Sequence, residues 1–230
     1  HSNLFAFGST FLVFSDYMRP SIRLASLMNL NSAYIFTHDS IYLGEDGPTH
    51  QPVEHLMSLR LIPGLDVIRP SNSIETIYAY RYLFSNTKNP KVLSLTRQNL
   101  KYLDYDIDYS DFLEGGFVIS KGKDLTIFAS GSEVNLALQI KEILKEFSVQ
   151  VVSVPILNKL TPEKSKSLNN NTLTFTLELG KAAGWSEYIG YTTESFSIQT
   201  FGKSAPEKDL AEFFRVNAES IGKKIRTYLG

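Results

Sequence analysis

Apolar side chains in the first hundred residues alternate between two kinds of spacing. Short apolar runs at residues 33–36, 65–68 and 92–95 have the length and composition of buried strands. Between these runs, residues 53–60 and 74–82 place apolar side chains three and four positions apart, as amphipathic helices do. An alternation of strand, helix and strand predicts a parallel sheet covered by helices.

Local signals refine this scheme. Residues 4–7 are strand-like, and apolar side chains between positions 18 and 28 fall near helical spacing. Pro20 is tolerated only near the start of a helix, so we place the first turn of that helix at residues 16–19. Pro52 suits the first position of the next helix. Asn72, with Glu75 three residues later, predicts a capped helix start.

A second α/β pattern follows residue 116. Strands are expected at 125–129, 149–154, 173–179 and 198–201, and helices after Ser132 and Thr161 and at 206–214 and 218–229. Residues 173–179 alternate apolar and polar side chains, which predicts a half-buried strand.

The segment between the two patterns is acidic, rich in tyrosine and without a clear period. We therefore predict two three-layer α/β domains with mostly parallel sheets, at residues 1–104 and 117–230, joined by a linker at 105–116. Because the chain begins abruptly in a strand-like run, we expect the first domain to be truncated at its N-terminus.

Composition narrows the class of protein. Hydrophobic residues make up 43% of the chain and charged residues 20%, which is typical of a folded soluble protein. The formal net charge of −1 gives no electrostatic reason to expect nucleic acid or an anionic membrane as a partner. No apolar run reaches the length of a membrane span. The chain has no cysteine, which excludes disulfides and fits a cytoplasmic location.

The segment Thr37 to Pro52 is the first place to look for chemistry. It follows a predicted strand, precedes a predicted helix and contains His38, Asp46 and His50. In open α/β sheets, ligands bind outside the carboxyl ends of the strands. Imidazoles exchange protons near neutral pH and can hydrogen-bond hydroxyls or phosphates. The alternative is a solvated loop in which the histidines only cap helix ends.

The same loop carries side chains that can bind metals: His38, Asp39, Glu45, Asp46 and His50. No recognisable ligand spacing is present, such as two histidines one helical turn apart. We therefore assign no metal ligand from the sequence.

Arg97 and three aromatic residues add to the candidate site. Arg97 follows the predicted strand at 92–95, where a guanidinium suits a phosphate or carboxylate; the alternative is a surface salt bridge. Phe11, Phe14 and Tyr17 are spaced by three, so at helical pitch they would share one face. That face could pack in the core or form a flat apolar pocket for a heteroaromatic ring.

Several stretches of the chain resemble the transketolase family. They are residues 8–17, 37–52 and 96–99 in the first predicted domain, and residues 131–134 and 201–206 in the second. The run from Thr37 to Pro52 is the most specific. Related thiamine enzymes, such as deoxyxylulose-phosphate synthase, share Asp-Gly-Pro-Thr-His at 46–50 but do not normally have Thr-His-Asp-Ser at 37–40 before it.

The resemblance implies an enzyme of the pentose phosphate pathway. With thiamine diphosphate, it would move a two-carbon ketol unit from a ketose phosphate to an aldose phosphate. By family analogy, Phe11, Phe14 and Tyr17 flank the cofactor's aminopyrimidine ring, with Phe14 as the stacking partner. His38 and Arg97 would bind the sugar phosphate, and Asp46 a substrate hydroxyl. His50 would contact the donor substrate and assist proton movement as the catalytic residue.

The resemblance also implies what to expect outside this chain. The family's glutamate that hydrogen-bonds the cofactor should lie shortly before His1, and an amino-terminal domain should hold Mg²⁺ and the diphosphate. The family forms homodimers with the site between subunits. Tyr42 stands where the family usually has glycine. We expect this chain alone to be inactive; the alternative is a non-catalytic fragment or a separate binding subunit of a split thiamine-diphosphate enzyme.

Overall fold

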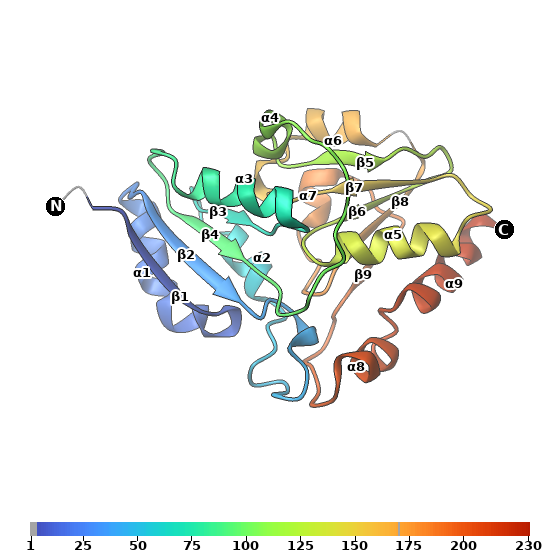
Figure 1. Cartoon of the computed structure of the whole chain (residues 1–230), viewed down its shortest axis with the longest axis horizontal. Helices are drawn as coiled ribbons and strands as arrows, with labels where there is room; N and C mark the ends of the chain where they lie inside the picture. Colours follow the sequence, from blue (N-terminus) through green and yellow to red (C-terminus); the bar gives the residue numbers. More distant parts are fainter. Residues whose placement is uncertain (1–3, 170) are drawn as a thin grey trace.

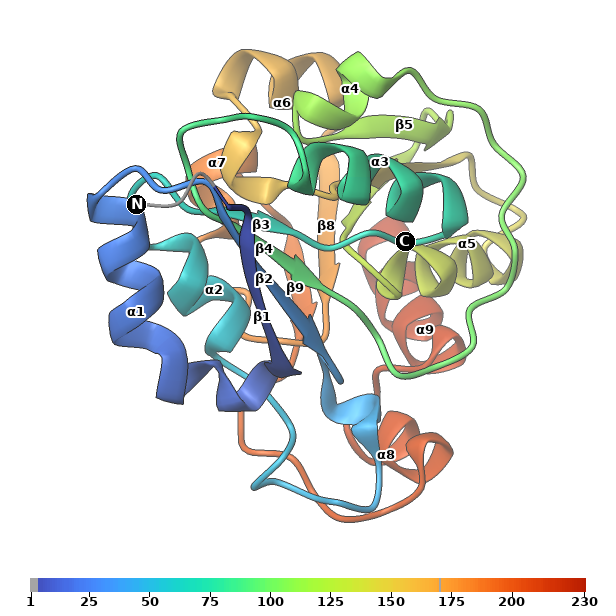
Figure 2. The same ribbon diagram turned by 60° about the vertical axis from the view of Figure 1, so that its left-hand side comes forward.

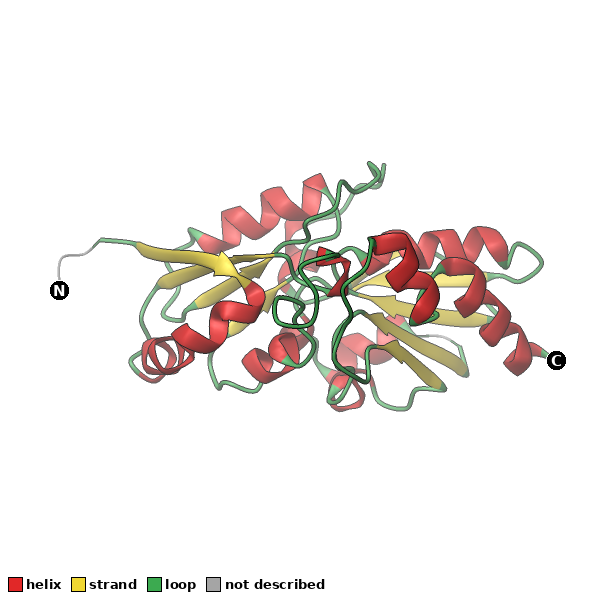
Figure 3. Ribbon diagram, turned by 90° about the horizontal axis from the view of Figure 1, so that it is seen from below, coloured by secondary structure: helices red, strands yellow, loops and turns green. Residues whose placement is uncertain are grey.

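A computed structural model describes residues 4–169 and 171–230. Two α/β units lie side by side, the first running from blue to green and the second from green to red (Figure 1). In each unit, helices cover both faces of a sheet, and the loops between the units gather where the two sheets approach each other (Figure 3). The fold class predicted from the sequence is confirmed.

The first unit contains a four-stranded, fully parallel sheet. Its strands are β1 (Ala6–Phe11), β2 (Ser32–Thr37), β3 (Asp66–Ile68) and β4 (Lys91–Ser94). Their order across the sheet is β1-β2-β4-β3. Side chains alternate between the faces: Tyr34 and Phe36 pack in one hydrophobic cluster, and Ala33 and Ile35 in another on the opposite face. The central strands are therefore buried on both sides, as parallel sheets usually are.

Helices cover both faces of this sheet. They are α1 (Ser15–Leu27), α2 (His55–Arg60), α3 (Ser73–Leu83) and the short α4 (Tyr109–Leu113). Helices α1 and α2 share one hydrophobic cluster with the sheet, and α3 and α4 share another. Figure 2 shows α1 and α2 together on one side and α3 on the other.

The second unit has a five-stranded sheet with one antiparallel member. Its strands are β5 (Phe117–Ser120), β6 (Leu125–Ala129), β7 (Val149–Ser153), β8 (Leu173–Glu178) and β9 (Glu194–Ser197), in the order β5-β7-β6-β8-β9. Only the β5–β7 pairing is antiparallel among these strands, all of which lie in the described part of the chain.

Four helices pack around the second sheet, and a fifth lies beside the first unit's polar loop. Helices α5 (Glu133–Ile143) and α9 (Ala218–Leu229) share one hydrophobic cluster, and α6 (Pro162–Leu168) and α7 (Trp185–Ile189) share another. Helix α8 (Glu207–Phe213) contacts a short 3-10 turn at Ile41–Leu43 in the first unit. No helix in the described ranges is long and apolar enough to cross a membrane.

The capping predictions have mixed outcomes. The side chain of Asn72 accepts a hydrogen bond from the amide of Glu75 at 2.9 Å, and Thr161 caps α6 by accepting from the amide of Lys164 at 3.2 Å. The prediction for Ser132 is wrong in its mechanism. Ser132 occupies the N-cap position, but its hydroxyl donates to the Glu133 carboxylate at 2.6 Å, because that carboxylate is buried and needs donors.

Several boundaries in the first unit differ from prediction. The first strand occupies Ala6–Phe11 rather than residues 4–7. Helix α1 begins at Ser15, so Pro20 lies in its second turn and cannot donate a bond to the carbonyl of Asp16. Helix α2 begins three residues after Pro52, because residues 44–52 form turns joined to the second unit.

Three predictions in the later part of the chain also need correction. Strand β8 is buried on both faces, since its threonines lie under α6 and α7 rather than in water. The last strand is β9 at Glu194–Ser197, not at residues 198–201. The segment predicted to be a linker contains α4, whose Phe112 is fully buried against α3. The domain boundaries themselves stay a prediction.

Candidate active site

The predicted site residues converge at one edge of the first sheet. In the parallel register, Phe11 pairs with Thr37 and Phe36 pairs with Ser94. Strands β1, β2 and β4 therefore end at the same level, and His38 follows β2 directly. Arg97 lies three residues beyond the end of β4. This edge is where parallel sheets place ligands.

Three aromatic rings and two imidazoles form a continuous row at this edge. The ring of Phe11 stacks on His38 with centroids 3.7 Å apart, and on Phe14 at 6.0 Å with 13° between the ring planes. Phe14 meets His50 edge-on at 5.3 Å and lies 6.2 Å from Tyr17. Tyr17 is 86% exposed, and the two phenylalanines are half-buried. The row therefore faces an open surface and is not packed into the core.

The aromatic residues do not share one helical face, contrary to the expectation from their spacing. Phe11 ends β1, Phe14 ends a 3-10 turn (Leu12–Phe14), and Tyr17 lies in the first turn of α1. The backbone changes from strand to helix across these residues, because β1 must turn back at the sheet edge. The three rings still come together, but through this turn rather than through helical pitch.

His38 is held by an unusual backbone conformation. Its φ is +59°, in the left-handed region that residues other than glycine enter only under local constraint. Its Nδ1 lies 2.9 Å from the hydroxyl of Thr37, and the next side chain, Asp39, is buried in an ion pair. The stacking of His38 on Phe11 and the ion pair of the adjacent Asp39 together fix the position of the His38 imidazole.

The electrostatics of His38 connect it to the other predicted ligands. Burial lowers the pKa of His38, and the positive charge of Arg97 lowers it further, while Asp46 and Asp39 act in the opposite direction. Both charges act on one imidazole, so Arg97 and Asp46 lie near His38. Asp46 and Arg97 are both exposed and available to a ligand there.

Replacing Arg97 with methionine should raise the pKa of His38. The substitution removes a positive charge that disfavours the imidazolium, and leaves Asp46 and Asp39, which favour it. Asp46→Asn should lower the pKa of His38 below its value in the wild-type chain, because it removes a negative charge that favours the imidazolium. An NMR titration of the His38 ring in the wild-type chain and both variants measures the shifts. Arg23→Met, at an exposed position of α1, is the matched control. Equal titration of all four proteins would contradict this electrostatic link.

The loop that carries Asp46 is clamped to the second unit. The buried side-chain amide of Gln51 lies within hydrogen-bonding distance of the carbonyl oxygens of Gly44, at 2.9 Å, and Lys203, at 2.9 Å. The hydroxyl of Ser204 donates to the loop backbone at Glu45. Gly47, at φ +77°, packs so closely that a Cβ there would lie 3.1 Å from the Ser204 side chain. Residues 201–206, a stretch noted in the sequence, therefore shape this loop (Figure 2).

Arg97 lies at the junction with α8. Burial raises the pKa of Glu207 at the start of α8, and the positive charge of Arg97 opposes that rise. Next to Arg97, the Gln98 amide donates to the carbonyl oxygen of Tyr42. Tyr42 in turn reaches across to the second unit, where its hydroxyl donates to Val216 at 3.3 Å. Tyr42 thus joins the two units at this loop.

A buried cluster of charges beneath the site escaped sequence analysis. Arg69, fully buried, donates to Asp39 at 2.8 Å and to Glu133 of the second unit. Arg60 makes two parallel bonds to Glu178 at 2.6 and 2.7 Å, which is the strong fork arrangement of guanidinium and carboxylate. This cluster ties α2 and the ends of β2 and β3 to the second sheet. It also anchors Asp39, the neighbour of His38.

The cluster explains the stretch at residues 131–134. Gly131 has φ +60°, and a Cβ there would lie 2.7 Å from the Arg69 side chain, so only glycine leaves room for that side chain. Glu133 then provides the carboxylate that Arg69 meets. Single charged residues far apart in a sequence resemble ordinary surface charges, and no local pattern could have indicated that they pair.

Two family models match successive parts of the chain. A family described as "Transketolase, pyrimidine binding domain" matches residues 1–102, and one described as "Transketolase-like TK C-terminal domain" matches residues 115–217. A transketolase of Halalkalibacterium halodurans is 40% identical over 241 residues, covering 100% of this chain and 36% of that protein. The chain thus spans about a third of the length of such relatives.

Solved structures give the same picture. A transketolase of Pichia stipitis, solved in complex with sedoheptulose 7-phosphate, has a TM-score of 0.88 at 33% identity, covering 95% of this chain and 33% of that one. A protein described as "Split gene transketolase, inactive beta4 tetramer" has a TM-score of 0.82 over 96% of this chain and 75% of its own. Its identity is 20%, so that similarity concerns the fold alone.

Proposed function

Because this chain belongs to the transketolase family, we propose that it forms part of the active site of a thiamine-diphosphate-dependent ketol transferase. The parent enzyme moves a two-carbon unit from a ketose phosphate to an aldose phosphate, as a step of the pentose phosphate pathway. The main support is the row of three rings and two imidazoles at the sheet edge, with Arg97 and Asp46 beside it.

The substrate roles follow from the charges at this edge. A guanidinium offers paired donors to a phosphate, and Arg97 is exposed three residues beyond the end of β4. His38, whose pKa is lowered by burial and by Arg97, gains a proton more readily when a phosphate anion approaches. The carboxylate of Asp46 accepts a hydrogen bond from a sugar hydroxyl. His50, in contact with Phe14, exchanges a proton with the reacting end of the donor substrate.

The aromatic row fits the flat part of thiamine diphosphate. Phe11, Phe14 and Tyr17 present apolar faces at an accessible edge, and Phe14 would stack on the aminopyrimidine ring. When bound, the cofactor supplies the carbanion chemistry of the reaction. Its diphosphate and Mg²⁺ would be held by a further domain of the parent protein. We extend the proposal to a homodimer in the cytoplasm, as the family resemblance implies.

A second candidate is a binding role without catalysis. The fold similarity to a split-gene protein suggests that a chain of this extent can exist as a separate subunit. In that case, this chain would bind a partner that holds the diphosphate and Mg²⁺. Both candidates share the expectation that the chain alone does not turn over substrate.

A chimera tests the proposal. This chain should replace the matching 36% of the Halalkalibacterium halodurans transketolase, to which it is 40% identical. We expect the chimera to transfer ketol units between sugar phosphates when thiamine diphosphate and Mg²⁺ are added, measured by a coupled assay. The isolated 230-residue chain, assayed in parallel, should show no turnover above background.

The outcomes separate the candidates. A folded, dimeric chimera without activity would contradict the catalytic proposal and favour a binding role. Turnover by the isolated chain would contradict the claim that it is inactive alone. Circular dichroism and size-exclusion chromatography distinguish an inactive chimera from an unfolded one.

A further inference from the structure

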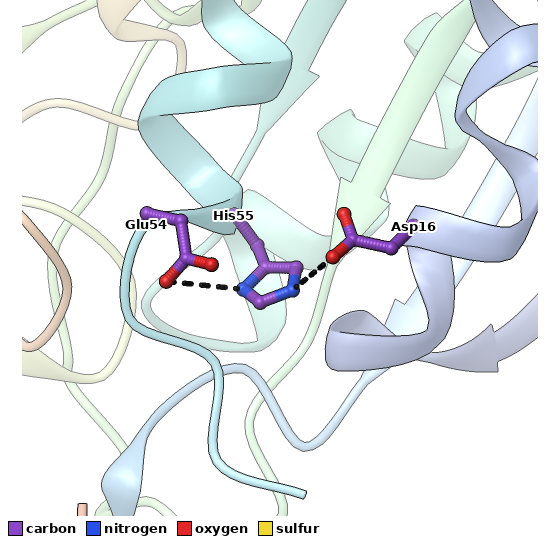
Figure 4. Close-up of side chains that lie close together, drawn as sticks. All are labelled: Asp16, Glu54 and His55. Carbon is purple, nitrogen blue, oxygen red and sulfur yellow. Dashed lines mark ion pairs between the residues drawn. The ribbon is translucent and has the colours of Figure 1, made fainter. Parts of the chain in front are cut away.

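A histidine outside the proposed active site lies buried between two carboxylates. His55 is the first residue of α2 and only 5% exposed. Asp16, in the first turn of α1, lies 3.3 Å from its Nε2, and Glu54 lies 3.9 Å from its Nδ1. Figure 4 shows the ring between the two carboxylates, with Asp16 at one edge and Glu54 at the other.

The contacts of His55 do not account for its burial. Neither ring nitrogen has a hydrogen-bond partner within the described part of the chain, although buried polar groups almost always have one. The Asp16 oxygen is close enough to Nε2 but lies outside hydrogen-bonding geometry. A buried imidazole with both nitrogens unbonded is costly, so a group that binds this ring would stabilise the fold.

Stabilisation of the helix ends explains the two acidic residues of this cluster but not the histidine. Acidic side chains are favourable at helix N-termini, which accounts for Asp16 at α1 and Glu54 before α2. It does not account for a buried, unbonded histidine between them. The two helices are already joined nearby, because Arg19 donates to the hydroxyl and carbonyl oxygens of Ser58 at 2.8 Å each. The framework that holds the cluster is therefore present without any ligand.

We propose that Asp16, Glu54 and His55 form a binding site for a divalent transition-metal ion such as Zn²⁺. A ligand atom from each residue lies within 4.8 Å of the other two, and no other such group occurs in residues 4–169 and 171–230. A tetrahedral ion with bonds of about 2.0 Å holds neighbouring ligand atoms about 3.3 Å apart, which is the separation of Nε2 and the Asp16 oxygen.

The ion would lie between Nε2 and Asp16. The carboxylate of Glu54 lies on the other side of the ring, beside Nδ1, and would join the ion by rotation of its side chain. Asp16 and Glu54 are 59% and 58% exposed, so both are free to rotate and water can fill the remaining position. One imidazole with two carboxylates suits Zn²⁺ and its neighbours in the first transition row better than Mg²⁺, which prefers oxygen ligands and retains several waters.

This site is separate from the Mg²⁺ that the proposed cofactor would require. Asp16 is adjacent to Tyr17, so an ion bound here would fix the start of α1 beside the aromatic row. The proposal concerns the side chains of this chain alone. It can be tested without substrate, thiamine diphosphate or any other part of the parent protein, and its failure leaves the proposed function untouched.

Isothermal titration with ZnCl₂ tests the site in the 230-residue chain. All proteins should carry His1→Ala, so that an imidazole at the start of the chain does not contribute. We expect one Zn²⁺ per chain, with affinity lowered more than about tenfold in His55→Gln and in Asp16→Asn. Glu142→Gln, at an exposed position of α5, is the matched control and should bind like the parent. MgCl₂ should give no comparable binding.

Each outcome bears on the proposal. Absence of Zn²⁺ binding by the parent chain, or equal binding by all the variants, would overturn it. If His55→Gln fails to fold by circular dichroism, Asp16→Asn still decides, because Asp16 is exposed and its loss leaves the core intact. A rise in melting temperature with Zn²⁺ in the parent chain, absent in Asp16→Asn, provides a second readout.

Discussion

Arg69→Met should lower the free energy of unfolding of this chain by about 3–5 kcal/mol, the usual cost of removing one partner from a buried ion pair. Methionine keeps most of the length of the side chain but leaves Asp39 and Glu133 buried without their cation. Arg60 cannot replace it, since both of its bonds go to Glu178. Urea denaturation followed by circular dichroism measures the loss.

The matched control is Arg23→Met on the exposed face of α1, which should change stability by less than about 0.5 kcal/mol. Adding Glu133→Gln to Arg69→Met should recover part of the loss. Burial raises the pKa of Glu133, so neutralising this carboxylate relieves part of the cost of a buried charge without a cation. A loss below about 1 kcal/mol in the single variant would mean that the cluster is solvated rather than buried.

His50→Asn should reduce kcat of the active chimera about 10²- to 10⁴-fold, the usual contribution of a positioned general acid or base. Asparagine keeps a polar side chain of similar reach but cannot exchange a proton near neutral pH. In the native chain, the ring of His50 meets Phe14 edge-on, so His50 lies beside the aromatic row. Steady-state kinetics with saturating donor and acceptor measures the effect.

Glu45→Gln is the control for this experiment, because it alters an exposed acid in the same loop whose side chain has no proposed role. It should leave kcat within about twofold. A change in KM alone for His50→Asn would assign the residue to binding rather than to proton transfer. Unchanged kinetics would contradict any role for His50, even though the chimera itself was active.

Much of the fold could be predicted because the local signals agree with the tertiary structure. The run at residues 33–36 is apolar on both faces, as a central parallel strand must be. Asn72 caps the start of α3 through its own side chain, which a local sequence signal can predict. The convergence of His38 and Arg97 follows from one rule about parallel strands. The family resemblance supplied the roles, which spacing and composition alone left open.

The rest depends on contacts between distant residues. Thr174 and Thr176 of β8 are buried because α6 and α7 cover them, and an alternating pattern gives no sign of that. The ion pairs of Arg69 join residues 30 and 64 positions apart. His55 looks like one more polar residue in a helix, and only the packing of α1 on α2 brings Asp16 to it.

The bonds from Gln51 and Ser204 have a mechanical consequence. They attach the loop that carries Asp46 to the second unit, although the loop belongs to the first. A hinge motion between the two units would break these bonds and pull Asp46 away from His38 and the rings. We therefore expect the two units to move together, so that Asp46 keeps its place beside His38 and the rings.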